Sequence, residues 1–406
     1  MSLSSTALEP VPEHVPPELV RPFPYILGET TTENPYSFVA DIHKGPPLFW
    51  AERVVNGISG AWVPRRDEDL RNIFMSVEHF SNRGLAPFAE LLGETWELVP
   101  AMYDPPRQTD YRRLLNPLFT PTKMAELDGK VRHYARELVA GLKDRGECLF
   151  MKDFAFEFPI KVFLELMGLP QDKVATFLEW EHGLLHEADL EKIKQATREV
   201  NAYLREQCDE RRNNPRDDLL TFGVRDAQIN GEPFSADELT GFCFNLFIGG
   251  LDTVSTNMGL QFRHLAENPD HQQYLRQNPD KIGQGIEELL RAYSPILNRR
   301  LCIKDTILHG VTIKKGDMLM VPTFLANRDP EAYDNPEQIR FDRKPRHLTF
   351  ATGPHLCLGI HLARRELRIA MEEFLNQVPP FRIAPGAVIE SYLQGVISPV
   401  ELPLVW

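Results

Sequence analysis

The sequence predicts a mainly α-helical protein with small β-sheets, built as one large domain. Residues 122–212 show the apolar spacing of successive amphipathic helices, broken at three proline-containing stretches. Residues 235–268 carry an unusually long helical pattern, whereas residues 305–322 are rich in strand-forming residues and turns. The 406 residues contain no Gly/Ser-rich linker and no repeat, so we expect a single domain over residues 25–406.

Composition and charge narrow the class of protein. The chain is 42% hydrophobic, which is enough for a substantial core, and its net charge of −13 argues against nucleic acid or anionic membranes as partners. Five dispersed cysteines without a C-x-x-C pair are typical of a reducing cytosol. No basic-then-apolar leader and no run of about eighteen apolar residues occur, so we expect a cytoplasmic protein without a membrane anchor.

The N-terminal part contains three expected features. Residues 1–24 carry six prolines and are predicted to be an extended segment. Short apolar runs on both sides of Asn56-Gly57 predict a β-hairpin. Pro105-Pro106 after Asp104 predicts a helix start, and the helix that follows carries Gln108, Arg112 and Arg113.

His182 and His186 are four residues apart, a spacing that places two side chains on one helical face. A metal site needs a third ligand and a drier setting than the stretch from Glu181 to Glu187 indicates. We therefore favour an ordinary helix surface here over a metal site.

The long helix is predicted to begin at Ser235-Ala-Asp-Glu238, which is a capping box. A continuous helix from there to Asn268 would be about 50 Å long at ~1.5 Å per residue.

The middle of this helix contains Gly249, Gly250, Asp252 and Thr253 in an otherwise apolar segment. Each glycine costs about 1 kcal/mol relative to alanine, and a buried carboxylate costs several more unless it is paired. A packing notch would explain the glycines only. Close approach of a flat ligand, with Thr253 hydrogen-bonding the carbonyl of Gly249 and Asp252 relaying protons, explains all four residues.

Two further stretches carry charged or reactive side chains. Glu288 and Arg291 are three residues apart on a predicted helix and can form an ion pair. Cys357 lies between Gly353 and Gly359, directly before a helical pattern. Backbone N–H groups at a helix N-terminus favour a thiolate, although a lone cysteine is more often a small buried hydrophobe.

The segment Phe350-Ala-Thr-Gly-Pro-His-Leu-Cys-Leu-Gly359 resembles the haem-ligand loop of the cytochrome P450 family at every fixed position. The resemblance implies the cytochrome P450 fold, with a long central helix over haem b (iron protoporphyrin IX) and the cysteine loop beneath it. Cys357 would be the proximal thiolate ligand of the haem iron, which favours O–O cleavage. The resemblance also covers the oxygen-activation motif at Gly250, Asp252 and Thr253, which makes Asp252 and Thr253 the expected catalytic residues.

The same resemblance assigns further residues around the haem. Glu288 and Arg291 match a structural Glu-x-x-Arg brace, with Arg340 as the expected third member and Arg343 as its competitor. The remaining haem-binding residues that it implies are Gln108, Arg112, Arg300 and His355 for the propionates, and Gly249, Gly250, Phe350 and Gly359 for close approach.

Within the family the chain is most similar to the soluble bacterial camphor-hydroxylating subgroup, through the stretches 102–106, 249–254, 355–359 and 402–406. It departs from that subgroup at four positions that bear on the substrate: Trp96, Leu98, Ala101 and Asn245. An apolar wall is expected from Ile248, Ile296, Val396 and Ile397. We expect a terpenoid or norisoprenoid substrate with at most one polar handle, held by the indole N–H of Trp96 or the amide of Asn245.

No flavin or nicotinamide fingerprint is present, so the resemblance implies O2 and electrons from a separate [2Fe-2S] ferredoxin with its ferredoxin reductase. Two interpretations of the arginines near the cysteine loop have equal weight: a docking patch for an acidic ferredoxin, or ordinary solvation and haem neutralisation. These arginines are Arg112, Arg113, Arg364, Arg365 and Arg368. A haem-thiolate protein for binding or gas sensing and a peroxide-driven enzyme are the alternatives; the acid–alcohol pair argues against both.

Overall fold

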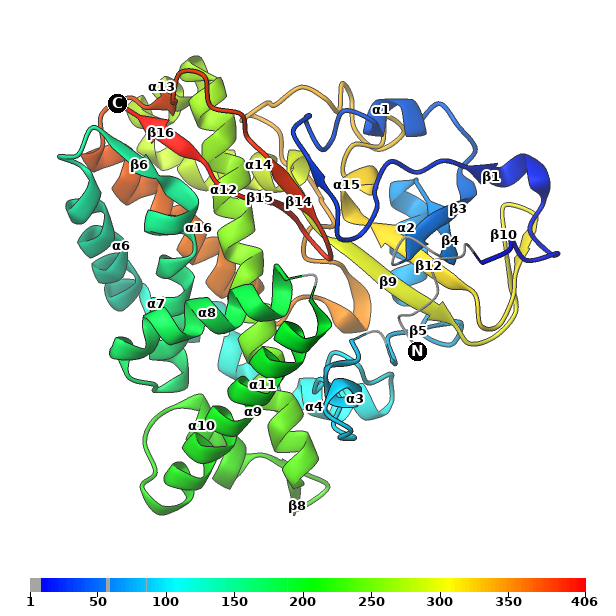
Figure 1. The fold of residues 1–406 in the computed structure, drawn as a ribbon, viewed down its shortest axis with the longest axis horizontal. Coiled ribbons are helices and arrows are strands. Elements are labelled where there is room, and N and C mark those ends of the chain that lie inside the picture. The colour runs from blue at the N-terminus through cyan, green and yellow to red at the C-terminus, as the bar shows by residue number, and fades with distance from the viewer. Residues whose placement is uncertain (1–8, 56–58, 85, 188) are drawn as a thin grey trace. The chain divides into compact units, whose positions relative to one another are not determined.

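The computed structural model describes residues 9–55, 59–84, 86–187 and 189–406. The chain groups into two compact units. The first unit consists of Met1–Leu85, Gln284–Cys357 and Val388–Val400, and the second of Ala86–Gly283, Leu358–Ala387 and Glu401–Trp406. Helices dominate and the sheets are small, which confirms the predicted fold class (Figure 1).

The first unit is organised by a six-stranded sheet with the order β1-β3-β4-β12-β9-β5. Its central strands are apolar on the side that packs against helix α2, where the buried core residues include Trp62, Leu70, Phe74 and Val321. The hairpin strands β3 and β4 pair Trp50 with Trp62. Gly60 leaves room for the Trp50 indole, because a Cβ at this position would lie 2.3 Å from the indole Nε1. Figure 1 shows the β3, β4, β12 and β9 strands of this sheet adjacent to one another.

The elements of the first unit are η1 (Pro17–Leu19), β1 (Val20–Arg21), β2 (Thr30–Thr31), α1 (Val39–Ile42), β3 (Leu48–Val55), β4 (Ser59–Pro64), α2 (Asp67–Met75), β5 (Phe80–Ser81), most of α14 (Ile282–Ala292), β9 (Leu297–Cys302), β10 (Thr306–Leu308), β11 (Val311–Ile313), β12 (Met318–Pro322), α15 (Thr323–Ala326), η7 (Gly353–His355), β14 (Ser391–Leu393) and β15 (Ile397–Pro399).

Two N-terminal predictions can be compared with this unit. The strands β3 and β4 form the predicted antiparallel hairpin, but its turn at Asn56-Gly57 lies outside the described residues. The proline-rich segment is partly regular, because η1 is followed by β1, which pairs in parallel with β3.

The second unit is mainly helical. An aromatic core is formed by stacked and edge-on rings, including Phe150 against Phe262 at 4.3 Å and Phe262 against Phe374 at 5.0 Å between centroids. A small sheet with the order β13-β16-β6 and the hairpin β7–β8 complete it.

The elements of the second unit are α3 (Phe88–Leu91), α4 (Arg107–Leu115), η2 (Asn116–Phe119), α5 (Pro121–Ala125), α6 (Asp128–Leu142), β6 (Glu147–Leu149), η3 (Met151–Ala155), α7 (Glu157–Met167), η4 (Gln171–Lys173), α8 (Val174–Leu185), α9 (Leu190–Asn213), α10 (Leu219–Thr221), η5 (Phe222–Asp226), β7 (Gln228–Ile229), β8 (Glu232–Pro233), α11 (Ala236–Gly250), α12 (Asp252–Glu267), α13 (Pro269–Gln277), η6 (Pro279–Lys281), α16 (Ile360–Gln377), β13 (Arg382–Ile383) and β16 (Pro403–Val405).

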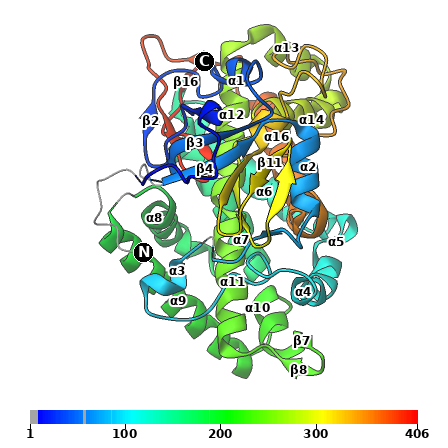
Figure 2. The same ribbon diagram turned by 90° about the vertical axis from the view of Figure 1, so that its right-hand side faces the viewer.

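The long predicted helix is interrupted, which corrects the expectation of one continuous element. Its start is confirmed, because Ser235 and Glu238 form the capping box of α11. The helix breaks at Leu251, which has φ −101 and ψ −74, and resumes as α12. Figures 1 and 2 show α11 and α12 following one another along one line.

The break has a local cause in the side chains that follow it. The hydroxyl of Thr253 donates to the carbonyl of Gly249 at 3.1 Å, and that of Ser255 to the carbonyl of Leu251 at 3.0 Å. Side-chain hydroxyls that hydrogen-bond carbonyls four residues earlier bend helices. Within the described ranges, no helix combines the length and apolarity needed to cross a membrane.

Candidate active site

The loop that carries Cys357 is held in a tight conformation within the first unit. The N–H of Cys357 donates to the carbonyl of Phe350 at 3.0 Å, and the N–H of Leu356 donates to that of Gly353 at 3.0 Å. Gly353 has φ +72, and a Cβ there would lie 2.9 Å from the Phe74 carbonyl oxygen of α2. Only glycine fits this position, so α2 and Gly353 together determine the path of the loop.

Cys357 differs from the other cysteines in its exposure. It is partly exposed, whereas Cys148, Cys208, Cys243 and Cys302 are buried. Gly359, two residues later, is the N-cap of α16, and a Cβ added to it would meet nothing within 4 Å. A partly exposed cysteine in a loop of fixed path fits a metal-ligand role, whereas it does not fit a cysteine that only fills core space.

Gly249 and Thr253 lie on opposite sides of the helix break at Leu251, in the second unit. The predicted hydrogen bond from Thr253 to the Gly249 carbonyl is confirmed. A Cβ at Gly249 would meet nothing within 4 Å, whereas a Cβ at Gly250 would lie 3.2 Å from the Phe163 ring. The two glycines therefore differ: Gly250 provides room for packing, and Gly249 leaves the helix surface open for a ligand.

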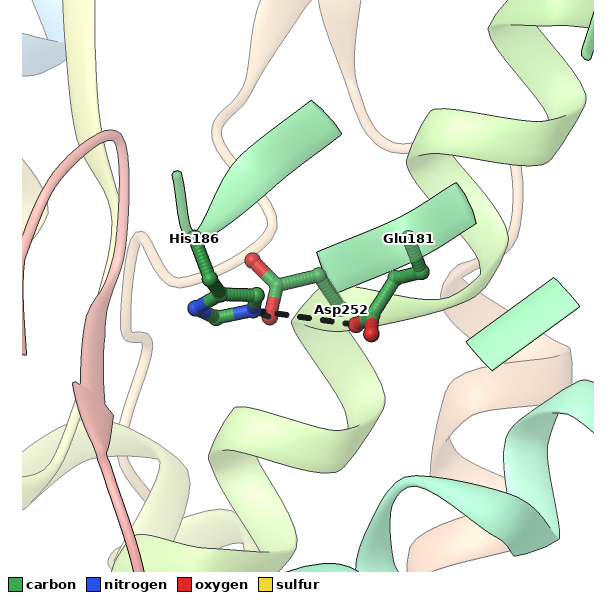
Figure 3. Close-up of side chains that lie close together, drawn as sticks. All are labelled: Glu181, His186 and Asp252. Carbon is green, nitrogen blue, oxygen red and sulfur yellow. Dashed lines mark hydrogen bonds and ion pairs between the residues drawn. The ribbon is translucent and has the colours of Figure 1, made fainter. Parts of the chain in front are cut away.

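Asp252 is the first residue of α12 and belongs to a buried cluster that the sequence did not predict. His186 Nε2 lies 3.1 Å from Asp252 Oδ1 and 3.8 Å from Glu181 Oε1. The three side chains point toward one another from the end of α8 and the start of α12 (Figure 3). Thr256 also donates to Asp252 Oδ1, at 3.3 Å.

The cluster shifts the pKa values of His186 and Glu181. Burial lowers the pKa of His186, but the hydrogen bond to Asp252 and the charges of Asp252 and Glu181 outweigh burial and raise it to about 10. Burial, with the charge of Asp252, raises the pKa of Glu181 against the opposing effect of His186. At neutral pH His186 therefore retains a proton that most isolated imidazoles would have released.

The two histidines at a spacing of four behave differently. Their rings stack at 5.8 Å between centroids, but the His182 side chain is 66% exposed and that of His186 only 12%. The surface interpretation therefore holds for His182 and is wrong for His186.

The predicted ion pair of Glu288 and Arg291 forms within the first unit and is fully buried. The prediction that the Arg340 side chain is the third member of this brace is wrong, because its guanidinium pairs with the exposed Asp342 at 3.0 Å. Arg343 completes the brace instead, with Nε 3.2 Å from Glu288 Oε1. Only the backbone N–H of Arg340 reaches that oxygen, at 3.0 Å, because the side chain turns outward to solvent.

The residues expected to bind propionates are distributed over both units. Arg300 on β9 is 4% exposed and its guanidinium lies 4.9 Å from the centroid of Phe74, while His355 is half-buried in η7. In the second unit Gln108 is buried on α4 and Arg112 is half-buried one turn later. Burial lowers the pKa of the neighbouring Arg299.

The expected substrate residues also divide between the units. In the first unit, Ile296 and Val396 form a β-bridge next to the buried Ile397. In the second unit, Trp96 and Leu98 are buried, while Ala101, Asn245 and Ile248 are half-buried.

The expected polar handles are partly engaged within the protein. The indole N–H of Trp96 donates to Glu94 at 2.5 Å, and one N–H of the Asn245 amide donates to the Val99 carbonyl at 3.1 Å. The amide group of Asn245 has a second N–H, so its expected role as a substrate handle stays a prediction. Among the contacts of the described residues, the Asn245 amide oxygen has no hydrogen-bond donor.

The predicted basic patch is partly neutralised within the second unit. Arg365 binds Asp128 through Nη1 at 2.7 Å and 2.8 Å, and Arg368 lies 3.6 Å from the same carboxylate. The Arg113 side chain is 75% exposed, and among the described residues its one ionic partner is the half-buried Asp110, at 3.1 Å. Arg113 is thus the more accessible charge, whereas Arg365 holds α16 to α6.

Comparisons with known proteins agree with the sequence motifs. A family model described as cytochrome P450 matches residues 160–378. The chain is 37% identical over 404 residues to a probable cytochrome P450 127A1 of Sinorhizobium fredii, covering 98% of this chain and 97% of that protein. It is similar to the crystal structures of cytochrome P450 CYP101C1 (TM-score 0.87, 32% identity, 98% of this chain and 99% of that chain) and CYP101J2 (TM-score 0.86, 28% identity, 98% and 100%).

Proposed function

The chain belongs to the cytochrome P450 family, and from that premise we propose that it hydroxylates a small terpenoid or norisoprenoid with O2 and electrons from a [2Fe-2S] ferredoxin system. Members of this family are haem monooxygenases that bind haem b through a cysteine thiolate. The observation that carries the proposal is the pair of Asp252 and Thr253. The Thr253 hydroxyl donates to the carbonyl of Gly249, where an added Cβ would meet nothing within 4 Å, and Asp252 directly follows the helix break at Leu251.

In this proposal Cys357 is the iron ligand. The bound haem would supply the iron that activates dioxygen for insertion into a C–H bond, and a thiolate ligand favours cleavage of the O–O bond. Gly353 and the Phe350 carbonyl hold the cysteine in its loop, and Arg300, His355, Gln108 and Arg112 bind the propionates.

Asp252 and Thr253 are assigned to proton delivery. The buried Asp252 carboxylate exchanges protons with the cluster around His186, which retains them at neutral pH. Thr253 lies next along the chain, with its hydroxyl on the open side of the helix beside Gly249. In this proposal protons pass from Asp252 to Thr253, whereas most other side chains of α12 are buried.

The cysteine and threonine assignments are tested together by the absorption of the reduced, carbon monoxide-bound protein. Cys357→Ser should lose the thiolate-type spectrum, because an alcohol ligand does not donate charge as a thiolate does. Thr253→Ala should keep that spectrum and instead divert electrons to hydrogen peroxide. A wild-type spectrum in Cys357→Ser would contradict the ligand assignment.

The structure alters the kind of substrate that we propose. The indole N–H of Trp96 and one N–H of Asn245 are used within the protein, whereas the second amide N–H and the amide oxygen of Asn245 remain for a ligand. A substrate alcohol, which both donates and accepts, can use both of these groups, whereas a ketone, which only accepts, can use the N–H alone. Spin-state titration of the ferric protein with matched terpenoid alcohols and ketones tests the assignment: the alcohol of each pair should bind more tightly, and Asn245→Leu should remove the difference.

The proposed ferredoxin donor is supported by the exposure of Arg113 on an otherwise acidic protein. Arg113→Glu should slow reduction by an acidic ferredoxin several-fold at low salt and flatten the salt dependence. The matched control is Arg198→Glu on α9, which is exposed but belongs to no predicted patch. Equal effects of the two changes would remove the docking assignment. Substrate turnover supported only by peroxide would favour the peroxide-driven alternative instead.

A further inference from the structure

The cluster of Glu181, His186 and Asp252 brings two carboxylates and one imidazole together in the interior of the second unit. One donor atom from each residue lies within 4.8 Å of the other two. Glu181 is 3% exposed and Asp252 is 5% exposed. Two carboxylates so close together in a dry setting are stabilised either by a proton on one of them or by a cation beside them.

The imidazole does not fully provide this stabilisation. Glu181 Oε1 is buried and has no hydrogen-bond partner among the described residues. Its distance of 3.8 Å from His186 Nε2 is that of an ion pair and exceeds a hydrogen bond. This oxygen points into the cluster with unused acceptor capacity (Figure 3).

The spacing of the three donors suits a small divalent ion. Zinc bonds to histidine nitrogen and carboxylate oxygen are about 2.0–2.2 Å, so neighbouring ligands of a tetrahedral site lie roughly 3.3–3.6 Å apart. The observed separations of 3.1 Å and 3.8 Å from His186 Nε2 bracket this range. For the two pairs that include His186, an ion therefore needs side-chain adjustments of only a few tenths of an ångström, and the Glu181 and Asp252 oxygens lie within 4.8 Å of one another.

We propose that Glu181, His186 and Asp252 form a binding site for one divalent transition-metal ion of the zinc type, separate from the haem iron. One imidazole and two carboxylates are a donor set that such ions accept, with a fourth position left for water. Coordination by His186 Nε2 displaces the imidazole proton into solvent, so binding strengthens as the pH rises.

The surroundings of the cluster hold its ligands in place. Thr256 hydrogen-bonds the Asp252 carboxylate, and the ring of Phe156 lies edge-on to the His186 imidazole at 5.9 Å between centroids. Outer contacts of this kind orient metal ligands and commonly change affinity 10- to 100-fold. His182 stacks on His186 but lies at the surface, so we assign it no ligand role.

Equilibrium dialysis of the chelator-treated holoprotein against Zn²⁺, with zinc and haem both quantified, tests the site directly. We expect one zinc ion per haem in the wild type. Glu181→Gln and His186→Gln should each weaken binding at least tenfold, because each removes a ligand. His182→Gln, on the same helix, should leave binding unchanged. The reduced carbon monoxide spectrum shows that each variant is folded with its thiolate ligand intact.

Two results would overturn the site. The first is absence of stoichiometric zinc from the wild type. The second is wild-type affinity in both Glu181→Gln and His186→Gln, which would place the zinc elsewhere.

A functional consequence rests on the proposed function. Zinc coordinated by Asp252 would occupy the carboxylate assigned to proton delivery and inhibit turnover reversibly, with recovery on chelation. Because binding and turnover are measured separately, the two proposals fail differently. Stoichiometric zinc without inhibition would contradict the role of Asp252 and leave the metal site standing, whereas zinc that inhibits equally in wild type and His186→Gln would contradict this site.

Discussion

Glu288 with Arg291 in the first unit, and Glu181 with His186 and Asp252 in the second, are both buried clusters of acidic and basic side chains. In the first cluster, Arg291 donates twice to Glu288 and also to the carbonyls of three loop residues: Asn327, Pro336 and Gln338. The Glu288 oxygen Oε1 receives further hydrogen bonds from the Arg340 backbone and the Arg343 side chain.

The second cluster has fewer contacts, although it contains three titratable groups and the pair of Glu288 and Arg291 only two. A histidine replaces the five-donor guanidinium, and Glu181 Oε1 has no hydrogen bond from a described residue. We call a cluster saturated when its hydrogen-bonding atoms are all paired. Such a cluster can only stabilise the fold, because any new ligand must break an existing hydrogen bond. An unsaturated one has free capacity for a proton or an ion, which is what a functional site requires.

The largest expected effect is that of breaking the saturated cluster. Arg291→Met leaves Glu288 buried without its main cation and three carbonyls without their donor. Removing one partner of a buried ion pair costs about 3–5 kcal/mol. Urea denaturation of the holoprotein should show this loss of unfolding free energy; a loss below about 1 kcal/mol would mean that the brace is dispensable.

Removing the histidine of the unsaturated cluster should cost less. His186→Gln removes a charged hydrogen bond, for which we expect a loss of about 1–3 kcal/mol at pH 7. The loss should be smaller than for Arg291→Met, because burial raises the pKa of Glu181 and so already favours its neutral form.

The same variant tests the pH dependence. The pKa of His186 is about 10 when folded and 6.5 in its ordinary state. A raised basic pKa stabilises the folded protein fully below pH 6.5 and loses this contribution as the pH rises toward about 10. The stability difference between wild type and His186→Gln should therefore shrink from pH 7 to pH 10. His182→Gln is the control, since burial lowers the pKa of His182 and the difference should not shrink in this way.

Arg343 and Arg340 form a matched pair within the saturated cluster. Arg343→Gln removes one partly buried contact to Glu288, and we expect a loss of about 1 kcal/mol. Arg340→Gln changes only an exposed pair with Asp342 and keeps the backbone contact, so its effect should stay within ~0.5 kcal/mol. The reverse order in thermal denaturation would restore Arg340 as the third member.

A small effect, with no loss of stability, is expected for Glu181→Gln. A raised carboxyl pKa opposes folding once the pH exceeds the ordinary value of 4.5, so the neutral amide should be tolerated or slightly stabilising at pH 7, within ~1 kcal/mol. Glu288→Gln, at a saturated position, should be clearly destabilising. Similar losses in both would show that the two clusters are equivalent and that Glu181 is structural.

Local features of the fold could be predicted from the sequence. The capping box at Ser235, the hydrogen bond from Thr253 to Gly249 and the pairing of Glu288 with Arg291 each depend on residues three or four positions apart. Such contacts follow from helical geometry alone.

The features that the sequence did not predict depend on distant contacts or on side-chain direction. His186 and Asp252 are 66 positions apart, and no periodicity relates α8 to α12. The choice between Arg340 and Arg343 depended on which guanidinium turns inward, and both arginines follow the same loop. The break at Leu251 was foreseeable in part, because the hydroxyls of Thr253 and Ser255 each bond a carbonyl four residues earlier.

The hydrogen bond of Thr253 also determines whether its hydroxyl can donate or accept toward its surroundings. A hydroxyl has one hydrogen to donate and two lone pairs to accept with, and Thr253 donates its hydrogen to the Gly249 carbonyl at 3.1 Å. Toward its surroundings the side chain is therefore an acceptor: it can orient a water or a protonated oxygen that donates to it, but it releases its own proton only by giving up the bond to Gly249. Thr253→Ser keeps the hydroxyl, whereas Thr253→Val removes it at nearly the same side-chain volume. The two variants therefore separate the effect of the hydroxyl from the effect of side-chain size.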